Sequence, residues 1–526
     1  MKKEKLYDGI TDIREDIIER AENYQFKKNN CRRVWIKWGS LAACLCLVVG
    51  LGLYSYNNMD VSLESDTESP AENGASGSGH SEGTMFMSYA GPVFPLTVRG
   101  QVGALEAERT VTMDFSTYEN IDEEAYGMAG GIYVRDSYEL VNSSEQEVSI
   151  VAVYPVSGDF QTTKWPVIMV DDTQVSWKLY AGAYTGGFTG AGDEYSTSLN
   201  LDEITSWEGY QELLSDGTYQ EDAFAESVSL DQPVTVYKLT ELTDGGYGDA
   251  ATLCMSFTYD SERTQIYTYG FNGAGVNEWT GEEYRDFFIR EGRREPDEDT
   301  KYLLVAGDDL AGYTLQGYQD GSCTPGEEIE GADATVTRVE TTMGEALKEI
   351  AQLRYQELRG NEFDGDHNRY VNERIDFDMY YQEICEFFAL YGPGGEEPKE
   401  RYGYGMLDDI VDEAAYHERI LYLTFSLTIP ADASVSVEVE QYKAGSFDYA
   451  CSGSENVGVE GYDMVTELGS SLSFTRQQAA IENYGGIEIV RQNFGFDIEN
   501  GVTQVELDMK KPHYYLEVRK VQDDSE

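Results

Sequence analysis

The chain has 526 residues, and its 97 Asp and Glu side chains outnumber its 38 Lys and Arg side chains, which gives a formal net charge of −59. This length is enough for roughly three or four domains. Nucleic-acid binding needs a cationic face, so the acidic excess excludes DNA and RNA as partners. Hydrophobic residues make up 41% of the chain and aromatic residues 12%, which indicates folded domains rather than an acidic disordered tail.

Residues 1–37 are predicted to form a cytoplasmic amphipathic helix followed by a basic flank. Apolar side chains recur at helical spacing, and among them are Ile10, Ile13 and Ile17. A helix this short cannot bury its apolar stripe alone, so the stripe must meet lipid headgroups, a second copy, or a cytoplasmic protein bound by residues 1–36. The third alternative makes Ile10, Ile13 and Ile17 candidate partner-binding residues.

Residues 38–56 are predicted to be a single transmembrane helix. No charged residue lies between Lys37 and Asp60, and an apolar run of about 20 residues spans a bilayer. Residues 1–37 carry ten basic and seven acidic side chains, so the rest of the chain has a net charge of −62. The basic flank places the N-terminus in the cytoplasm and the C-terminal bulk outside the cell membrane.

Two processing alternatives are less consistent with this segment. Lipidation at Cys44 requires the apolar run to precede that cysteine, but most of the run follows it. Cleavage after Gly52 would secrete the chain, but a charged leader of 37 residues is longer than a signal peptide normally carries. We therefore expect a permanent anchor, followed by a flexible linker over residues 57–83, which are rich in Ser, Gly, Glu and Asn.

Residues 84–230 are predicted to be a β-sandwich-like domain. One expected hairpin joins 132–141 to 148–154, and a second joins 167–170 to 175–180 through Asp171 and Asp172. Residues 231–337 again favour strands and form a second β-rich region.

A helical segment is predicted over residues 338–420. Thr342 and Glu345 form a capping box at the start of the first helix, and further helices are expected at 377–391 and 406–420. The pattern then changes, because apolar residues alternate with polar ones over 421–429, as in a half-buried strand that opens a C-terminal β domain over 421–522. The fold class is therefore mainly β with an inserted helical segment (α+β), preceded by a transmembrane helix and a linker.

No catalytic motif is evident in the sequence. The four histidines form no spaced pair, and neither a nucleophile elbow nor a zinc-protease motif is present. The carboxylates outside the membrane are too numerous to single out an acid–base pair, because such pairs are defined by their separation in space.

One loop resembles the start of a calcium-binding loop. Asp364, Asp366 and Asn368 place oxygen ligands at alternate positions, as calcium prefers. Arg369 then stands where the tight turn needs Gly, and Ile375 stands where a bidentate acid belongs. The same residues therefore also fit a polar connection between two helices, and no other cofactor is indicated.

Four of the seven cysteines follow the predicted span: Cys254, Cys323, Cys385 and Cys451. An even number allows three different pairings. Large domains do not need disulfide bonds for stability, so we expect buried thiols, but the sequence leaves their redox state open.

Three stretches carry a resemblance to other proteins: the N-terminal helix followed by residues 38–44, the segment Met87–Leu96, and the ending His513–Arg519. The chain resembles, over most of its length, single-pass membrane-anchored surface proteins of Gram-positive anaerobes, a group without an established activity. The resemblance implies an N-terminal anchor and an extracytoplasmic β-rich body, and it implies no site residues.

The function expected from the sequence is that of a surface binding or structural module that meets a cell-wall or extracellular ligand. Two alternatives stay open. The protein could be a transmembrane regulator whose cytoplasmic helix binds a signalling partner such as a sigma factor, or an extracellular hydrolase that depends on carboxylates.

Overall fold

The computed structural model describes residues 89–521 with internal gaps. The gaps are 101–104, 120–130, 248–250, 278–280, 290–299, 320, 322, 324–325, 361–370, 397, 400–401, 448–455 and 469–471, and between 185 and 227 only 207, 211, 214 and 223–225 are described. The predicted helix 1–37, span 38–56 and linker 57–83 lie outside these residues. Within the described ranges, no helix combines the length and apolar character needed to cross a bilayer.

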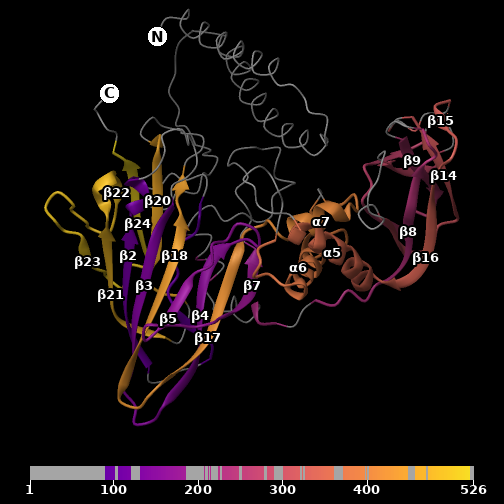
Figure 1. The fold of residues 1–526 in the computed structure, drawn as a ribbon. Helices are drawn as coiled ribbons and strands as arrows, with labels where there is room; N and C mark the ends of the chain where they lie inside the picture. The colour runs from indigo at the N-terminus through magenta and orange to yellow at the C-terminus, as the bar shows by residue number, and fades with distance from the viewer. Residues whose placement is uncertain are drawn as a thin grey trace, which may run out of the picture. The chain divides into compact units, whose positions relative to one another are not determined.

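The described chain is mainly β, as predicted, and its strands form five sheets (Figure 1). Sheet 1 has the order β1 (Thr97–Val98), β4 (Val148–Gly158), β17 (Arg419–Ile429), β7 (Lys178–Tyr184). Sheet 2 has the order β23 (Gln504–Glu506), β21 (Ser473–Glu482), β2 (Leu105–Asp114), β3 (Gly131–Asn142), β18 (Ala433–Ala444), β5 (Val167–Val170), β6 (Thr173–Gln174). Sheet 3 has the order β19 (Ser446–Phe447), β20 (Val459–Val465), β24 (His513–Lys520), β22 (Ile487–Gln492).

The other two sheets come from one continuous stretch of chain. Sheet 4 has the order β10 (Thr264–Tyr269), β13 (Lys301–Gly307), β8 (Pro233–Asp244), β16 (Ala332–Thr342). Sheet 5 has the order β11 (Gly273–Val276), β12 (Glu283–Ile289), β9 (Ala251–Thr258), β14 (Gly312–Tyr318), β15 (Glu328–Ile329). Strands from 97–184 and from 419–520, by contrast, alternate within sheets 1 and 2, because β17 lies between β4 and β7 and β18 lies between β3 and β5.

The inserted helical segment consists of α5 (Met343–Gly360), α6 (Phe377–Tyr391) and α7 (Leu407–Glu413). The capping box is confirmed at α5, where the Glu345 backbone N–H donates to Thr342 Oγ1 at 3.3 Å. Helix α7 is shorter than the predicted 406–420, because the chain turns at Ala414 and β17 already begins at Arg419. Two short 3₁₀ helices lie at Ser116–Glu119 and Tyr484–Gly486.

The expected hairpin between 132–141 and 148–154 is wrong, since β3 belongs to sheet 2 and β4 to sheet 1. The connection is a corner at which the chain passes from one sheet to the other. Asn142 links this corner to a second one, between β17 and β18. Its side-chain amide donates to the backbone oxygen of Gln146 at 2.8 Å in the first corner, and to those of Ile429 at 3.2 Å and Pro430 at 3.0 Å in the second.

The second expected hairpin is correct in its turn and wrong in its second strand. Asp171 and Asp172 have φ angles of 45° and 59°, as a two-residue type I′ turn requires, and they join β5 to β6. Strand β6 stops at Gln174, however, and Lys178–Tyr184 continues into sheet 1 as β7.

Strand β17 is buried on both faces over its first seven residues, Arg419–Phe425, and alternates only after them. The prediction of a half-buried strand therefore holds for its second half alone. Leu421 and Leu423 point into the core shared with sheet 2, whereas Ile420 and Tyr422 pack on the other face in a cluster that includes Val465 of sheet 3.

One face of sheet 2 packs against sheet 1 at one end and against sheet 3 at the other. Ala107 of β2 and Leu140 of β3 belong to the core with sheet 1. Further along the same face, Val111 of β2 and Val134 of β3 belong to a second core, which they share with Leu516 and other residues of sheet 3. The boundary between the two cores crosses sheet 2 between these positions.

A belt of buried polar side chains occupies this boundary. Arg109 of β2 and Asp136 of β3 are fully buried and form a bidentate ion pair, with both N···O distances at 2.8 Å. On the neighbouring strands, Gln477 of β21 accepts from Arg109 at 3.4 Å, and Gln441 of β18 donates to the Tyr154 hydroxyl of sheet 1 at 2.6 Å. The Tyr154 hydroxyl in turn donates to Asp136 at 3.1 Å.

The same guanidinium also satisfies backbone oxygens from outside sheet 2. Arg109 Nη1 donates to the carbonyl of Val465, the last residue of β20, at 2.6 Å, and Nη2 donates to the carbonyl of Phe94 at 3.3 Å. Residues 89–98 run along this junction, because Val93 bridges to Met464 in sheet 3 before Thr97 and Val98 pair with β4 in sheet 1. The belt therefore ties three sheets together.

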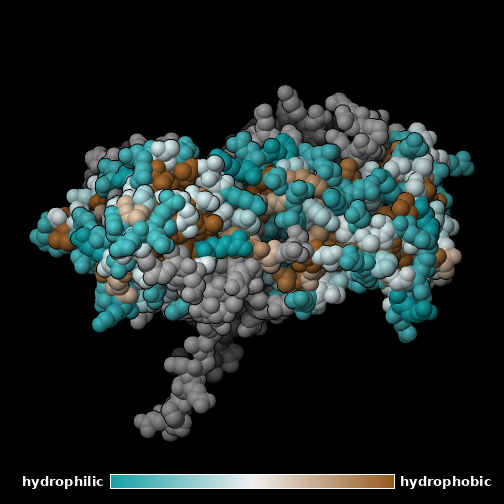
Figure 2. Space-filling model, turned by 90° about the horizontal axis from the view of Figure 1, so that it is seen from below, coloured by the Kyte–Doolittle hydropathy of each residue, from teal (hydrophilic) through white to brown (hydrophobic). Residues whose placement is uncertain are grey.

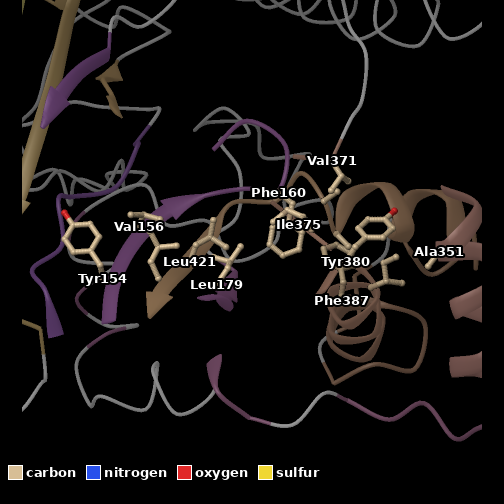
Figure 3. Packing of buried hydrophobic residues seen from close by; sticks show 14 of the residues in the cluster. Tyr154, Val156, Phe160, Leu179, Ala351, Val371, Ile375, Tyr380, Phe387 and Leu421 are labelled. Atoms are coloured by element: carbon tan, nitrogen blue, oxygen red, sulfur yellow. The ribbon is translucent and has the colours of Figure 1, made fainter. Parts of the chain in front are cut away.

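The core of the sandwich formed by sheets 1 and 2 continues without a break into the helices and sheet 4. Figure 3 follows this cluster from Tyr154 and Leu421 through Phe160 and Ile375 to Phe387 on α6. Sheet 4 contributes, among others, Val234 and Leu304. Sheets 4 and 5 enclose a further core of their own, which includes Leu253 and Leu303. On the face drawn in Figure 2 hydrophilic residues predominate and hydrophobic ones are scattered, as expected for a solvated acidic surface.

We expect Asp136→Ala to lower the free energy of unfolding by about 3 to 5 kcal/mol, because it leaves the buried Arg109 charge without its partner. The matched control is Glu440→Ala, which removes an ion pair at 3.8 Å between two exposed side chains, Arg135 at 40% and Glu440 at 56%. We expect this substitution to lower the free energy of unfolding by less than about 1 kcal/mol. Urea denaturation of both variants measures the difference, and equal losses would contradict the role of the belt.

Candidate functional site

The residues that the sequence singled out as candidate ligands or partner contacts are not brought together in the described structure. Asp364, Asp366 and Asn368 lie in 361–370, outside the described residues, and so do Ile10, Ile13 and Ile17. Among the residues that are described, no three His, Cys, Asp or Glu side chains are placed to hold a metal ion. Cys254, Cys323 and Cys385 are buried thiols, and Cys451 is outside the described part.

An open groove of about 330 Å³ lies along β17 in sheet 1; two of its lining residues, Trp177 and Phe425, also pack into the core shared with sheet 2. This volume is at the lower end of the range for small-ligand sites, about 300 to 1,000 Å³. The groove is lined by Val151, Ser176, Trp177, Lys178, Thr424, Phe425 and Ser426.

Strand alternation directs the polar lining outward. Leu423, Phe425 and Leu427 of β17 belong to the core, so Thr424 and Ser426 face the other side of the sheet. Ser426 pairs with Val151 of β4, and Thr424 pairs with Lys178 of β7. The groove therefore lies where the second face of β17 changes from buried, at Thr424, to exposed, at Ser426.

Trp177 is held in place by its neighbours. The Trp165 ring lies 5.6 Å from it between centroids at an interplanar angle of 45°, and the Arg374 guanidinium lies 4.9 Å from its ring centroid. Trp165 is fixed in turn, because its indole N–H donates to Asn372 Oδ1 at 2.7 Å. An aromatic ring that is already ordered in the unbound protein loses little conformational entropy when a ligand packs on it.

Lys178 gives the groove a positive charge. Its ammonium group lies 4.4 Å from the centroid of the Tyr180 ring, and its backbone oxygen accepts from Thr424 Oγ1 at 3.3 Å. The chain after residue 37 has a net charge of −62, so an exposed cation stands out on its surface. The Lys178 ammonium group favours a ligand that presents oxygen atoms or a negative charge.

The lining residues combine an indole ring, three hydroxyl groups and an ammonium group. They can stack on an apolar ring face, exchange hydrogen bonds with hydroxyls and attract oxygen acceptors. The lining itself contains no histidine or carboxylate to act as a general base for Ser176 or Ser426.

Sequence reasoning missed this groove, although a signal was present. The strand 421–429 carries hydroxyls at alternate positions, and Ser176-Trp177-Lys178 opens a neighbouring strand. The sequence could not show that β17 and β7 pair across more than 230 residues of intervening chain.

A second polar group lies at the junction of sheets 1, 2 and 3. Lys443 Nζ of β18 donates to the Ala90 carbonyl at 2.5 Å, close to the carboxylates of Asp463 and Glu418. Asp463 accepts from the Tyr89 hydroxyl and lies 2.8 Å from Nε2 of His513. The His513 ring also stacks on Trp207, with the ring centroids 5.5 Å apart.

Burial shifts the protonation equilibria of this group. It lowers the pKa of Lys443 to about 8, although Asp463 and Glu418 oppose the change. Burial, with the nearby charge of Asp159, raises the pKa of Glu418 to about 7, and Lys443 opposes that shift. The pKa values of Glu418 and Lys443 therefore both lie near neutral pH.

Comparison with known proteins shows weak structural likeness. No protein-family pattern matches the chain, and no curated protein matches it in sequence. Among solved structures, the chain is similar to a candidate nutrient binding protein from Legionella pneumophila, with 7% sequence identity and a TM-score of 0.26 over 81% of this chain and 70% of that one. A likeness of this size establishes neither a shared fold nor a shared ligand.

The Glu418 carboxyl makes the stability of the protein depend on pH. Because its pKa is about 7 in the folded chain and near 4.5 when unfolded, the folded state holds the extra proton between these values and loses stability as pH rises through them. One pKa unit corresponds to about 1.4 kcal/mol. The side chain is half-buried, so solvent screens part of this effect. We expect the wild type to lose about 1 to 2 kcal/mol more unfolding free energy between pH 5 and pH 7 than Glu418→Gln loses.

Urea denaturation at pH 5 and pH 7 measures that difference. The control is Glu440→Gln, which changes an exposed carboxylate on β18 and should keep the wild-type pH profile. If Glu418→Gln and the wild type lose stability in parallel, Glu418 titrates as an ordinary surface group.

Proposed function

We propose that the protein is a surface binding module, tethered to the cell membrane by residues 38–56, whose groove on sheet 1 binds a short hydroxyl-rich ligand such as a glycan segment. The groove carries the proposal, because it is lined by Trp177, by Lys178 and by the exposed hydroxyls of Ser176 and Ser426, next to the buried Thr424. Glycans present C–H ring faces and hydroxyl groups together, which an indole ring and hydroxyl side chains complement.

The membrane tether rests on the sequence. The uncharged run after Lys37 and the basic residues before it favour a single span with the N-terminus inside. In that orientation the groove faces the extracellular medium, where cell-wall polymers and other glycans are available.

Protease treatment of intact cells tests the orientation. We expect protease to remove a C-terminal epitope tag while leaving residues 1–37 protected, because only the chain beyond the span is outside. Cytoplasmic protein should stay intact in the same sample as a control. A tag that survives until the cells are lysed, or full-length protein in the medium, would show that the anchor or its direction is wrong.

Ligand binding by the full-length chain in detergent micelles tests the groove. We expect a glycan or wall polymer to bind, and Trp177→Ala to weaken its binding about threefold to tenfold, because the ring contact contributes about 0.5 to 1.5 kcal/mol. Fluorescence anisotropy with a labelled glycan measures the dissociation constant.

The matched control is Tyr404→Ala, which removes a ring that is 75% exposed and does not line the groove; it should leave binding unchanged. Equal binding by the wild type and Trp177→Ala would exclude the groove as the binding site. Hydrolysis of the glycan by the purified protein would favour the carboxylate-dependent enzyme instead.

A further inference from the structure

Two of the buried cysteines belong to the same small region of sheet 5. Cys254 lies on β9, between β12 and β14, where it pairs with Asp286 on one side and Gln316 on the other. Its neighbours Leu253 and Met255 point into the core between sheets 4 and 5. Because side chains alternate along a strand, Cys254 lies on the opposite face of the sheet.

Cys323 lies on the connection between β14 and β15, and its side chain reaches this opposite face, where it hydrogen-bonds to Cys254. Cys254 is 2% exposed and Cys323 is 5% exposed. The connection lies close to the sheet at Gly321, where an added Cβ would come within 3.4 Å of the Phe288 ring and 3.9 Å of Asp286 Oδ2. The two cysteines are thus brought together from positions 69 residues apart in the chain.

The two thiols are in direct contact. The Cys323 thiol hydrogen-bonds to that of Cys254, and Cys254 Sγ also lies 3.8 Å from the Ser256 hydroxyl. The hydrogen bond from Cys323 is the main cause that lowers the pKa of Cys254, against the effect of burial. A lower pKa increases the fraction of thiolate, which is the form that attacks disulfides.

The two cysteines lie in different local structures. Cys254 is in a strand with hydrogen-bonded neighbours on both sides. Cys323 lies in a loop closed by the Gln319 N–H, which donates to the Glu327 carbonyl at 3.1 Å, and its φ angle of 48° is in the left-handed region that non-glycine residues rarely adopt.

We propose that Cys254 and Cys323 form a disulfide bond when the protein meets a low-molecular-weight disulfide, and that this bond links Cys323 to strand β9. One cysteine thiolate attacks the external disulfide, which forms a mixed disulfide and releases one thiol. The second cysteine thiolate attacks the sulfur of the cysteine in that mixed disulfide and releases the second thiol. The two protein thiols are oxidised, the external disulfide is reduced to two thiols, and the two protons pass to these thiols.

This modification site is separate from the groove on sheet 1, and its chemistry does not depend on what the groove binds. A disulfide here is compatible with the proposed extracytoplasmic location, since disulfides persist in oxidising surroundings.

The experiment uses the full-length chain in detergent micelles with oxidised glutathione. Remaining thiols are blocked with iodoacetamide in denaturant, and the protein is digested with trypsin without reduction. We expect mass spectrometry to find one peptide pair joined through Cys254 and Cys323, which separates after reduction with dithiothreitol. The number of cysteines that can be alkylated falls from seven to five.

Two variants serve as matched controls. Cys385→Ser removes a buried thiol on α6 and should leave the Cys254–Cys323 peptide pair unchanged. Cys323→Ser should abolish the pair. The wild-type digest is decisive even if Cys323→Ser does not fold: recovery of Cys254 and Cys323 as separate alkylated peptides after oxidation, or linkage of either one to Cys451, would overturn the proposal.

Discussion

The buried ion pair between Arg109 and Asp136 sets the arrangement of the surrounding sheets. A charge pair inside a protein is tolerated only when its remaining donors and acceptors are satisfied, and here the partners come from β20, from the Phe94 carbonyl and from Tyr154 of sheet 1. Apolar residues on either side of the pair belong to two different cores. The polar belt thus fixes where sheet 1 ends and sheet 3 begins on the same face of sheet 2.

The groove on sheet 1 follows from that division. Among the described residues, those that pack on the outer face of sheet 1 form a cluster around Val153, Ile420 and Tyr422, which includes Val465 of sheet 3. Beyond them, the outer face of β17 carries hydroxyl side chains that are open to solvent at Ser426 and Thr428. A strand that is buried on both faces at one end and on one face at the other therefore provides both an anchor in the core and a polar surface for binding.

The sequence predicted the element types well and the strand pairing poorly. The capping box at Thr342, the turn at Asp171 and Asp172, and the helix ending before Gly392 depend on neighbouring residues, so local rules were sufficient. The pairing of β17 with β4 and β7 joins distant parts of the chain, which no local pattern encodes. The groove and the contact between Cys254 and Cys323 both depend on such pairings, so neither could be predicted from the sequence.

The interleaving of early and late strands also constrains the order of events during synthesis. Strands β4 and β7 are complete once residue 184 has left the ribosome, but β17, which lies between them, begins only at Arg419. Until then both strands have unsatisfied edges, and such edges invite pairing with other chains. The strands of 233–342 pair with one another apart from a single bridge between Thr268 and Met406, so this middle region can form its sheets while the N-terminal strands still need protection.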